Sequence, residues 1–284
     1  MRPVEPALLA VTSAFLFGAM TVALRIALQR GAEAEAGAFL TVLVAFLVVL
    51  PFALVAGGEL TGAWPFLLAG ILGPGASQVL FTLGVRDAGA SRASVVVGTA
   101  PLFAVAIALV FLDEPLEAGL VAGALLIVGG GIALASERRR PERFRAVGLV
   151  YALAATVVFA TRDNVVRWLS GDTEVEPALA ACATLLSGGL CILAFLFLTG
   201  RRPGFRALPT FAPAGILFGL SYVSLFAAFY GARVSVVSPL VATESLWGVA
   251  LSALVIGRSE RIGVRVVAGA VLVVAGGVLI GSFR

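Results

Sequence analysis

The chain has 284 residues, of which 60 % are hydrophobic and only 13 % are charged. Soluble domains usually have about 25 % charged and about 45–50 % apolar residues, so a soluble protein of this length would lack the charges to cover its surface. The net charge is +4, but the arginines stand at the ends of apolar segments, which argues against a nucleic-acid-binding surface. The composition therefore predicts a chain whose outer surface is solvated by lipid.

Apolar stretches follow one another along the chain, each with the roughly 20 residues that a helix needs to cross about 30 Å of hydrocarbon. In order they cover residues 6–28, 35–56, 63–85, 92–112, 117–136, 145–168, 175–199, 208–231, 234–256 and 263–281. The runs are continuous, whereas strands of a membrane barrel would alternate apolar and polar residues. The sequence thus predicts an all-α integral membrane protein of about ten spans, with the first stretch retained as a span. Pro74 and Pro213 interrupt the third and eighth stretches, and Pro101 and Pro239 predict kinks in the fourth and ninth.

The two halves of the sequence resemble each other at an offset that drifts from 142 to 146 residues. Four matches occur in the same order: residues 16–19 with 158–161, 70–72 with 215–217, 99–103 with 243–247, and 122–131 with 268–277. We therefore predict a first five-helix repeat at 1–137, a charged connecting loop at 138–144 and a second repeat at 145–284. Because each repeat has an odd number of spans, the second must be inverted relative to the first, an arrangement common in transporters that work by alternating access.

All 20 basic residues are arginine, and their distribution predicts the orientation in the membrane. Fifteen belong to the connections after spans 1, 3, 5, 7 and 9, and five lie on the opposite side. Because cytoplasmic loops collect basic residues, the bias places the central charged loop in the cytoplasm and both termini outside. We expect a multi-pass protein of the plasma (inner) membrane. Its oligomeric state stays open.

The residue types exclude several kinds of chemistry. Histidine and lysine are absent, and the two cysteines, Cys182 and Cys191, lie in one apolar stretch. We therefore expect no disulfide framework, metal site or cofactor. A membrane enzyme would need a nucleophile with a base, a metal set or a pair of acids, and the two deep acids, Asp163 and Glu244, lie in separate spans. We therefore do not expect this protein to be an enzyme. A purely structural subunit is a further alternative, but it would not need polar residues at mid-span.

Several motifs give the chain a resemblance to the drug/metabolite transporter superfamily, in its ten-span EamA-type branch. They are Phe17-Gly18, the small-residue stretch 88–94, Thr99-Ala100-Pro101-Leu102-Phe103, Leu112-Asp113-Glu114-Pro115-Leu116 and a glycine-rich fifth span. The second half departs from the pattern, because Ser245 stands where proline is usual and Arg258-Ser259-Glu260 replaces the acidic pair. The resemblance implies a proton-linked or facilitative carrier or exporter of metabolites. Amino-acid exporters are prominent among its bacterial members.

Ionisable side chains at membrane depth are costly and point to the solute pathway. Glu244, about ten residues into the ninth stretch, is the first candidate; it could bind a cation, an amine or a proton, or be a neutral carboxyl between helices. Trp247, at i+3, would share its face and could hold an ammonium group. Arg162 and Asp163 are adjacent, so we do not expect them to pair as i,i+4 neighbours do. Arg25 and Arg167, equivalent in the two repeats, are expected to extend to the headgroups.

Uncharged polar residues complete the predicted substrate-binding set, although hydroxyl and amide groups also bridge helices. The third and eighth stretches carry several of them at matching positions, and the aligned pair is Ser77 with Tyr222. The full set is Glu244, Trp247, Tyr222, Ser77, Gln78, Thr82, Ser221, Thr243, Asp163 and Asn164. It fits a transporter of a small metabolite, such as an amino-acid exporter, with protons as possible second partners. The alternative is a proton-coupled exporter of drugs or quaternary cations, which would depend on Glu244 and Trp247.

Overall fold

The computed structural model describes residues 4–58, 60–111, 118–137, 144–171 and 173–282, and these residues form helices and connections without a strand. The first half contains α1 (Val4–Gln29), α2 (Ala34–Ala56), α3 (Trp64–Gly70), α4 (Ser77–Ala88), α5 (Ala90–Val97), α6 (Ala100–Phe111) and α7 (Ala118–Ala135). The second half contains α8 (Val147–Leu169), α9 (Pro177–Leu198), α10 (Leu208–Gly231), α11 (Val234–Val241), α12 (Glu244–Leu251) and α13 (Val264–Ser282). Short helical turns connect them at Leu60–Ala63, Ile71–Ala76, Phe205–Ala207, Ser252–Ile256 and Gly257–Glu260.

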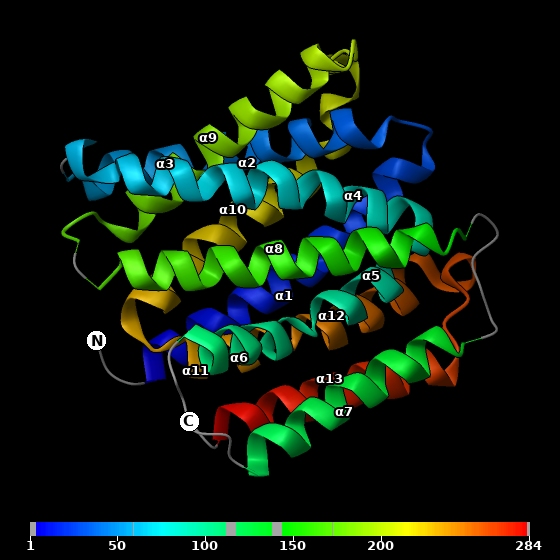
Figure 1. Cartoon of the computed structure of the whole chain (residues 1–284). Coiled ribbons are helices and arrows are strands. Elements are labelled where there is room, and N and C mark those ends of the chain that lie inside the picture. Colours follow the sequence, from blue (N-terminus) through cyan, green and yellow to red (C-terminus); the bar gives the residue numbers. More distant parts are fainter. Residues whose placement is uncertain (1–3, 59, 112–117, 138–143, 172, 283–284) are drawn as a thin grey trace.

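The helices coincide with the ten predicted spans. Seven helical segments are long and apolar enough to cross a bilayer, and two shorter apolar helices lie within α7 and α13. The pair α5–α6 covers the remaining stretch, which is the fourth. In Figure 1 the helices lie roughly along a common direction, and the beginning of α1 and the end of α13 are at the same end of the bundle, as an even number of spans requires. The expectation of an all-α fold with ten spans is confirmed.

Interruptions of the helices only partly follow the prolines. The third span is broken at Ile71–Ala76, which contains Pro74 and the extended residue Gly73, whereas α10 continues through Pro213. The fourth and ninth spans are both interrupted, at residues 98–99 and 242–243. These interruptions are equivalent in the repeat alignment, although the prolines are not.

The turn that interrupts the fourth and ninth spans has the same hydrogen bonds in both halves. The Thr99 amide donates to the Val96 carbonyl, and the Thr243 amide donates to the Leu240 carbonyl. Each threonine hydroxyl also donates to that same carbonyl oxygen, at 2.6 Å in both cases. The two halves therefore share a local device that bends a span by a tight i→i−3 turn.

The two halves interlock instead of packing as separate bodies. Helix α1 packs against α10, and its repeat counterpart α8 packs against α4, the counterpart of α10. Likewise α2 packs against α9 and α7 against α13. When each helix is replaced by its counterpart in the other half, the contact between α1 and α10 becomes the contact between α8 and α4. This exchange is what an inverted repeat with its axis in the membrane plane produces.

Glycines bring α7 and α13 into close backbone contact. A Cβ added to Gly123 would lie 2.7 Å from the Gly276 carbonyl oxygen, and one added to Gly130 would lie 2.8 Å from the Gly269 carbonyl oxygen. The contacts cross in opposite sequence order, so the two helices are antiparallel, and Figure 1 shows them side by side. Gly130 and Gly276 thus lie at the contact, whereas Gly129 and Gly131 face open space. Small residues serve helix association in lipid in this way.

The distribution of polar and apolar side chains is reversed relative to a soluble protein. Large apolar side chains such as Val55 and Leu198 are almost fully exposed, whereas Arg92, Arg162 and Glu260 are buried. In water such a surface would be an aggregation hazard. In a bilayer the exposed apolar side chains face hydrocarbon, and the helices satisfy their own backbone groups.

Candidate functional site

A small cavity lined by both polar and apolar residues lies between spans 1, 4, 6, 8 and 9. Its volume is about 40 Å³, room for about three water molecules when each needs about 10–15 Å³. Its lining is shared by both halves and consists of Ser13, Phe17, Val97, Ala100, Phe159, Arg162, Asp163, Ser221, Tyr222, Leu225, Ser238, Val241, Ala242 and Glu244. Pockets for drug-sized ligands have about 300–1,000 Å³, so the cavity must widen before it receives a solute larger than water.

Arg162, on α8, is the cationic group of the cavity. Its Nε lies 2.7 Å from Asp163 Oδ1, and its Nη1 donates a hydrogen bond of 2.5 Å to the Tyr222 hydroxyl. The guanidinium also lies over the rings of Phe159 and Tyr222, at 5.6 and 5.0 Å from their centroids. The expectation that Arg162 and Asp163 do not pair is wrong, because the long arginine side chain turns back to its neighbour. Within the described residues Nη2 has no hydrogen-bond partner, so the guanidinium keeps donors for an anion.

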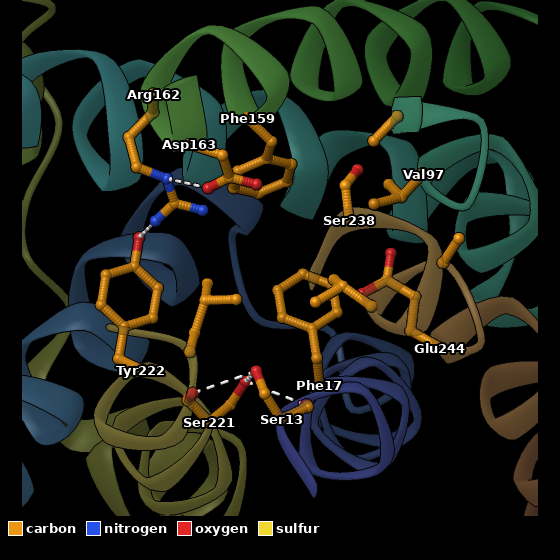
Figure 2. A pocket seen from close by; sticks show the side chains of 14 residues that line it. Ser13, Phe17, Val97, Phe159, Arg162, Asp163, Ser221, Tyr222, Ser238 and Glu244 are labelled. Atoms are coloured by element: carbon orange, nitrogen blue, oxygen red, sulfur yellow. Dashed lines mark hydrogen bonds and ion pairs between the residues drawn. The ribbon is translucent and has the colours of Figure 1, made fainter. Parts of the chain in front are cut away.

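Glu244, the first residue of α12 in the ninth span, is the third ionisable residue of the lining after Arg162 and Asp163, and it is 4 % exposed. Its carboxyl interacts electrostatically with Asp163 and Arg162, but it makes no hydrogen bond or ion pair within the described part of the chain. Figure 2 shows Glu244 reaching the cavity from a different side than Arg162, Asp163 and Tyr222 do. A buried ionised carboxyl without a partner is costly, so this group is suited to holding a proton or a cationic solute.

The apolar part of the cavity has the symmetry of the repeat. Phe17 and Phe159 are aligned in the two halves, their rings meet edge to face at 5.9 Å, and both line the cavity. The aligned pair Val97 and Val241 lines it as well. Figure 2 shows the two phenylalanines between the Arg162 group and Glu244. The cavity therefore lies at the pseudo-symmetry axis, while most of its polar groups come from the second half.

One end of the pathway is sealed by tight packing of α1, α5 and α12. A Cβ at Gly18 would lie 2.9 Å from the Gly248 amide nitrogen, and one at Gly248 would overlap the Ser94 side chain. These residues follow Phe17, Val97 and Glu244 toward the end of the bundle that carries Arg25. Along α1 in that direction Thr21 and Leu24 are completely buried. The cavity is closed on this side.

A buried ionic network completes the seal. Arg25 Nε lies 2.9 Å from Glu260 Oε1, and Arg25 Nη1 donates to the carbonyl oxygens of Val85 and Arg86. The other Glu260 oxygen accepts a bond from the Ser91 hydroxyl at 3.2 Å. Because Arg25 is only 7 % exposed, the expectation that it extends to the headgroups is wrong: it finds a buried counter-ion instead. Its counterpart Arg167 is half-buried and donates to the Phe229 carbonyl.

Four of the predicted substrate-binding residues line the cavity together: Glu244, Asp163, Tyr222 and Ser221. Ser221 exchanges hydrogen bonds with Ser13 of α1, with 2.9 Å between the hydroxyl oxygens, and so joins the two halves at the cavity wall. The other six lie outside the lining: Trp247, Ser77, Gln78, Thr82, Thr243 and Asn164.

The residues outside the lining have three different surroundings. Thr82, Thr243 and Asn164 donate to carbonyl oxygens of their own helices. Trp247 is 37 % exposed on the outer surface and meets Phe15 edge to face at 5.2 Å. Ser77 and Gln78 are completely buried beside the cavity region, in the span that does not line it.

The lining also contains residues outside the predicted binding set, namely Arg162, Phe159, Phe17, Ser13 and Ser238. For Arg162 the sequence had left a gating or binding role open against a polar cluster near the membrane surface. The repeat contained a signal for the two phenylalanines, because aligned residues at mid-span meet at the symmetry axis. No sequence signal distinguished Ser13 from other serines in apolar stretches.

Ten apolar spans in two interlocked, inverted halves, bent spans at equivalent positions and a polar cavity on the axis between the halves define a multi-pass membrane protein built as transporters are. The sequence matches the EamA-like transporter family twice, over residues 5–136 and again over 146–282. The chain belongs to this family, and it is a membrane transporter.

One curated protein and one solved structure are also similar to this chain. The chain is 31 % identical over 193 residues to a protein of Streptantibioticus cattleyicolor named "Probable terminal-alkyne amino-acid exporter". The match covers 66 % of this chain and 62 % of that protein. A solved crystal structure superposes with a TM-score of 0.70 over 97 % of this chain and 96 % of the other, at 17 % identity. That likeness concerns the fold alone.

Proposed function

We propose that this transporter is a secondary carrier that exports an amino acid or a closely related metabolite by alternating access. The observation that carries the proposal is one cavity that contains both a cationic and an acidic group. The Arg162 guanidinium is suited to the carboxylate of a zwitterion, because arginine offers donors in a planar fork that matches carboxylates. Glu244, without a partner among the described residues, is suited to the ammonium group.

The apolar rings between these groups favour an apolar side chain on the solute. Phe17 and Phe159 form the wall between Arg162 and Glu244. The relative from Streptantibioticus cattleyicolor is named for amino acids with a terminal alkyne, a short apolar group that would suit such a wall. The match covers 62 % of that relative, so the likeness supports a class of solute, apolar amino acids, and not one compound.

The position of Trp247 weighs against a carrier of quaternary cations. Such a carrier would use aromatic faces around the acid, but Trp247, which shares the helix of Glu244, lies outside the cavity lining on the outer surface. Phe17 and Phe159 are the rings that remain near the acid. Arg162 is paired with Asp163, and a quaternary cation would leave its remaining donors unused. The carboxylate of a zwitterion can accept hydrogen bonds from them.

A counterflow experiment in proteoliposomes tests the proposal. Vesicles loaded with an unlabelled mixture of apolar amino acids should accumulate the labelled compounds, whereas vesicles loaded with quaternary amines should not accumulate labelled amines. Glu244→Gln should abolish accumulation while the protein still purifies as a folded species. Glu174→Gln, the same change at an exposed acid between α8 and α9, should leave accumulation unchanged.

Two results would contradict the proposal. Counterflow of quaternary amines without that of amino acids would assign the site to cations. Undiminished amino-acid counterflow in the Glu244→Gln variant would remove this carboxyl from solute binding.

A further inference from the structure

Two neighbouring side chains on α4 have no hydrogen-bond partner among the residues that the structure describes. Ser77 and Gln78 are 0 % exposed, and the Ser77 hydroxyl and both polar atoms of the Gln78 amide are unpaired. These atoms are almost inaccessible to a water-sized sphere. Leaving a buried donor or acceptor unpaired costs stability, whereas an apolar residue of the same shape would not. The hydroxyls of Ser94, Tyr230 and Ser252 are also unpaired among the described residues, so the repeat has to show which of these groups a second arrangement of the chain would satisfy.

The repeat indicates what that arrangement is. Ser77 aligns with Tyr222, whose hydroxyl is bonded to Arg162 in the cavity. Its neighbour Ala76 aligns with Ser221, and both Ser221 and Tyr222 line the cavity, whereas Ala76 and Ser77 do not. Spans 1 and 6, and spans 4 and 9, contribute aligned residues to the lining from both halves. In the pair of spans 3 and 8, by contrast, span 8 contributes residues to the lining and span 3 contributes none.

Ser77 lies close to the cavity even though it does not face it. A Cβ at Gly73 would be 3.1 Å from the Ser77 hydroxyl oxygen and 3.2 Å from Arg162 Cγ. The glycine thus separates the serine from the stem of the arginine and leaves no room for a side chain between them. A modest movement of α4 relative to α8 would bring the Ser77 hydroxyl to the guanidinium side.

The sealed end of the pathway gives the direction of that movement. The structure is closed toward the end that carries Arg25, Ser91 and Glu260, where three elements meet at one buried carboxyl. In transporters built from inverted repeats, alternating access is largely a rocking of one repeat against the other around a fixed site. Because the two halves are related by symmetry, opening the closed end would bring span 3 to the place that span 8 has here.

We propose that Ser77 and Gln78 are solute contacts of the opposite access state, in which the Arg25–Glu260 end is open. Ser221 and Tyr222 line the cavity when that end is closed, and they withdraw from it when it opens. Arg162 serves both states, with the Tyr222 hydroxyl on one side and the Ser77 hydroxyl on the other. That these residues contact a solute rests on the proposed function. The change in their exposure between the two states does not, because it is a property of the protein alone.

Thiol labelling without any solute tests the change in exposure. In a background in which the free cysteines Cys182 and Cys191 are replaced by alanine, single cysteines are placed by Ser77→Cys and Ser221→Cys. A membrane-impermeant methanethiosulfonate reagent is then added from either side of sealed vesicles. When the Arg25–Glu260 pair is intact we expect both cysteines to react slowly, because Ser77 and Ser221 are 0 and 1 % exposed, and we expect Ser221→Cys, at the cavity lining, to be the faster of the two.

Removing the ionic seal should reverse the pattern. Glu260→Gln should raise the rate at Ser77→Cys, from the Arg25 side, by about tenfold, and should lower the rate at Ser221→Cys by a similar factor, a shift of about 1.4 kcal/mol. The double variant Arg25→Gln/Glu260→Gln leaves no unpaired charge between these two residues, and so repeats the test if the single variant folds poorly. Thr41→Cys on α2, at a fully buried hydroxyl bonded to the Gly37 carbonyl, should remain unreactive in every background.

Two labelling outcomes would overturn the proposal. Ser77→Cys that stays unreactive in both seal variants would show that α4 does not enter the pathway. Equal gains at Ser77→Cys and Thr41→Cys would show a general loosening of the bundle. Both results could occur while amino-acid counterflow is intact, so failure here is distinguishable from failure of the proposed function.

A transport measurement separates a solute contact from a structural role. If Gln78 were only a poorly satisfied core residue, Gln78→Leu would keep or raise the melting temperature and leave transport unchanged. We expect it to keep the melting temperature but to raise the KM for solute presented on the Arg25 side, with partial rescue by Gln78→Asn. Thr41→Val, a loss of a buried hydroxyl outside the pathway, should change neither quantity. Unaltered KM in Gln78→Leu would contradict the assignment of Gln78.

Discussion

Arg25 and Glu260 form an ion pair of 2.9 Å across 235 positions of sequence, between the first span and the connection that precedes the last. The carboxyl side chain is fully buried, and Ser91 completes its hydrogen bonding. Arg25 also donates to the last carbonyl oxygens of α4 through Val85 and Arg86. One arginine therefore ties together three parts of the chain at the closed end of the pathway.

The first prediction concerns the stability that this pair provides. Removing one partner of a buried ion pair leaves an uncompensated charge and costs about 3–5 kcal/mol. Arg25→Gln should therefore lower the melting temperature of the detergent-solubilised protein clearly, and Arg25→Gln/Glu260→Gln should recover part of the loss. Arg145→Gln removes an arginine whose side chain is 67 % exposed and leaves Asp87 paired with Arg86, and exposed pairs are worth about 0–1 kcal/mol. Equal losses in the Arg25 and Arg145 variants would show that burial does not decide the energy here.

The second prediction concerns the Tyr222 hydroxyl. Hydrogen bonds to charged groups contribute about 1.5–3 kcal/mol, so Tyr222→Phe should raise the KM for the solute about tenfold or more by letting Arg162 leave its place. The ring packing against Phe218 and Phe226 is retained, so the melting temperature should fall only by as much as the loss of this one hydrogen bond requires.

Tyr230→Phe is the matched control for this substitution. Its hydroxyl is buried without a hydrogen-bond partner, so removing the oxygen should leave transport unchanged and should not destabilise the protein. A KM that rises equally in both tyrosine variants would assign the effect to general packing.

The fold was predictable to a large extent because the bilayer imposes simple rules on sequence. A membrane-spanning helix needs a long apolar run and must form the hydrogen bonds of its backbone within itself. The apolar runs were therefore sufficient to predict the spans. The inverted halves followed from the repeat, and even the equivalent turns at Thr99 and Thr243 could have been anticipated from it. The close contacts of Gly130 and Gly276 were predictable because small residues serve the same purpose in many membrane helices.

The cavity was less predictable because sequence does not show where a hydroxyl points. Thr82 and Thr243 were reasonable candidates, but each donates to a carbonyl oxygen of its own helix, a bond that any span can offer to threonine. The Arg25–Glu260 pair joins residues with no sequence spacing to suggest a contact. Glu244 and Asp163 were found because an acid within an apolar run is costly wherever it points.

The third prediction concerns protons. If a proton and the solute ammonium group compete for Glu244, an acidic exterior should drive export, and low pH on both sides should slow equilibrium exchange by occupying the carboxyl. Glu244→Gln should remove the response to a pH gradient, measured as solute flux from proteoliposomes with and without the gradient. Glu174→Gln should retain the response. A full pH response in the Glu244 variant would place the coupling at another group.

The fourth prediction tests the contact between α7 and α13 with two glycines of the same helix. A Cβ at Gly123 would be 2.6 Å from the Ile280 side chain and 2.7 Å from the Gly276 carbonyl oxygen, whereas one at Gly129 would meet nothing within 4 Å. Gly123→Ala should therefore force the helices apart and lower the melting temperature. Gly129→Ala should be neutral or raise it slightly, because alanine favours a helix over glycine by about 0.5–1 kcal/mol. If α7 and α13 were held mainly by contacts other than backbone approach, the two variants would behave alike. A melting temperature that falls only in the Gly123 variant would show that the pseudo-symmetric glycine contact sets the distance between the last spans of the two halves.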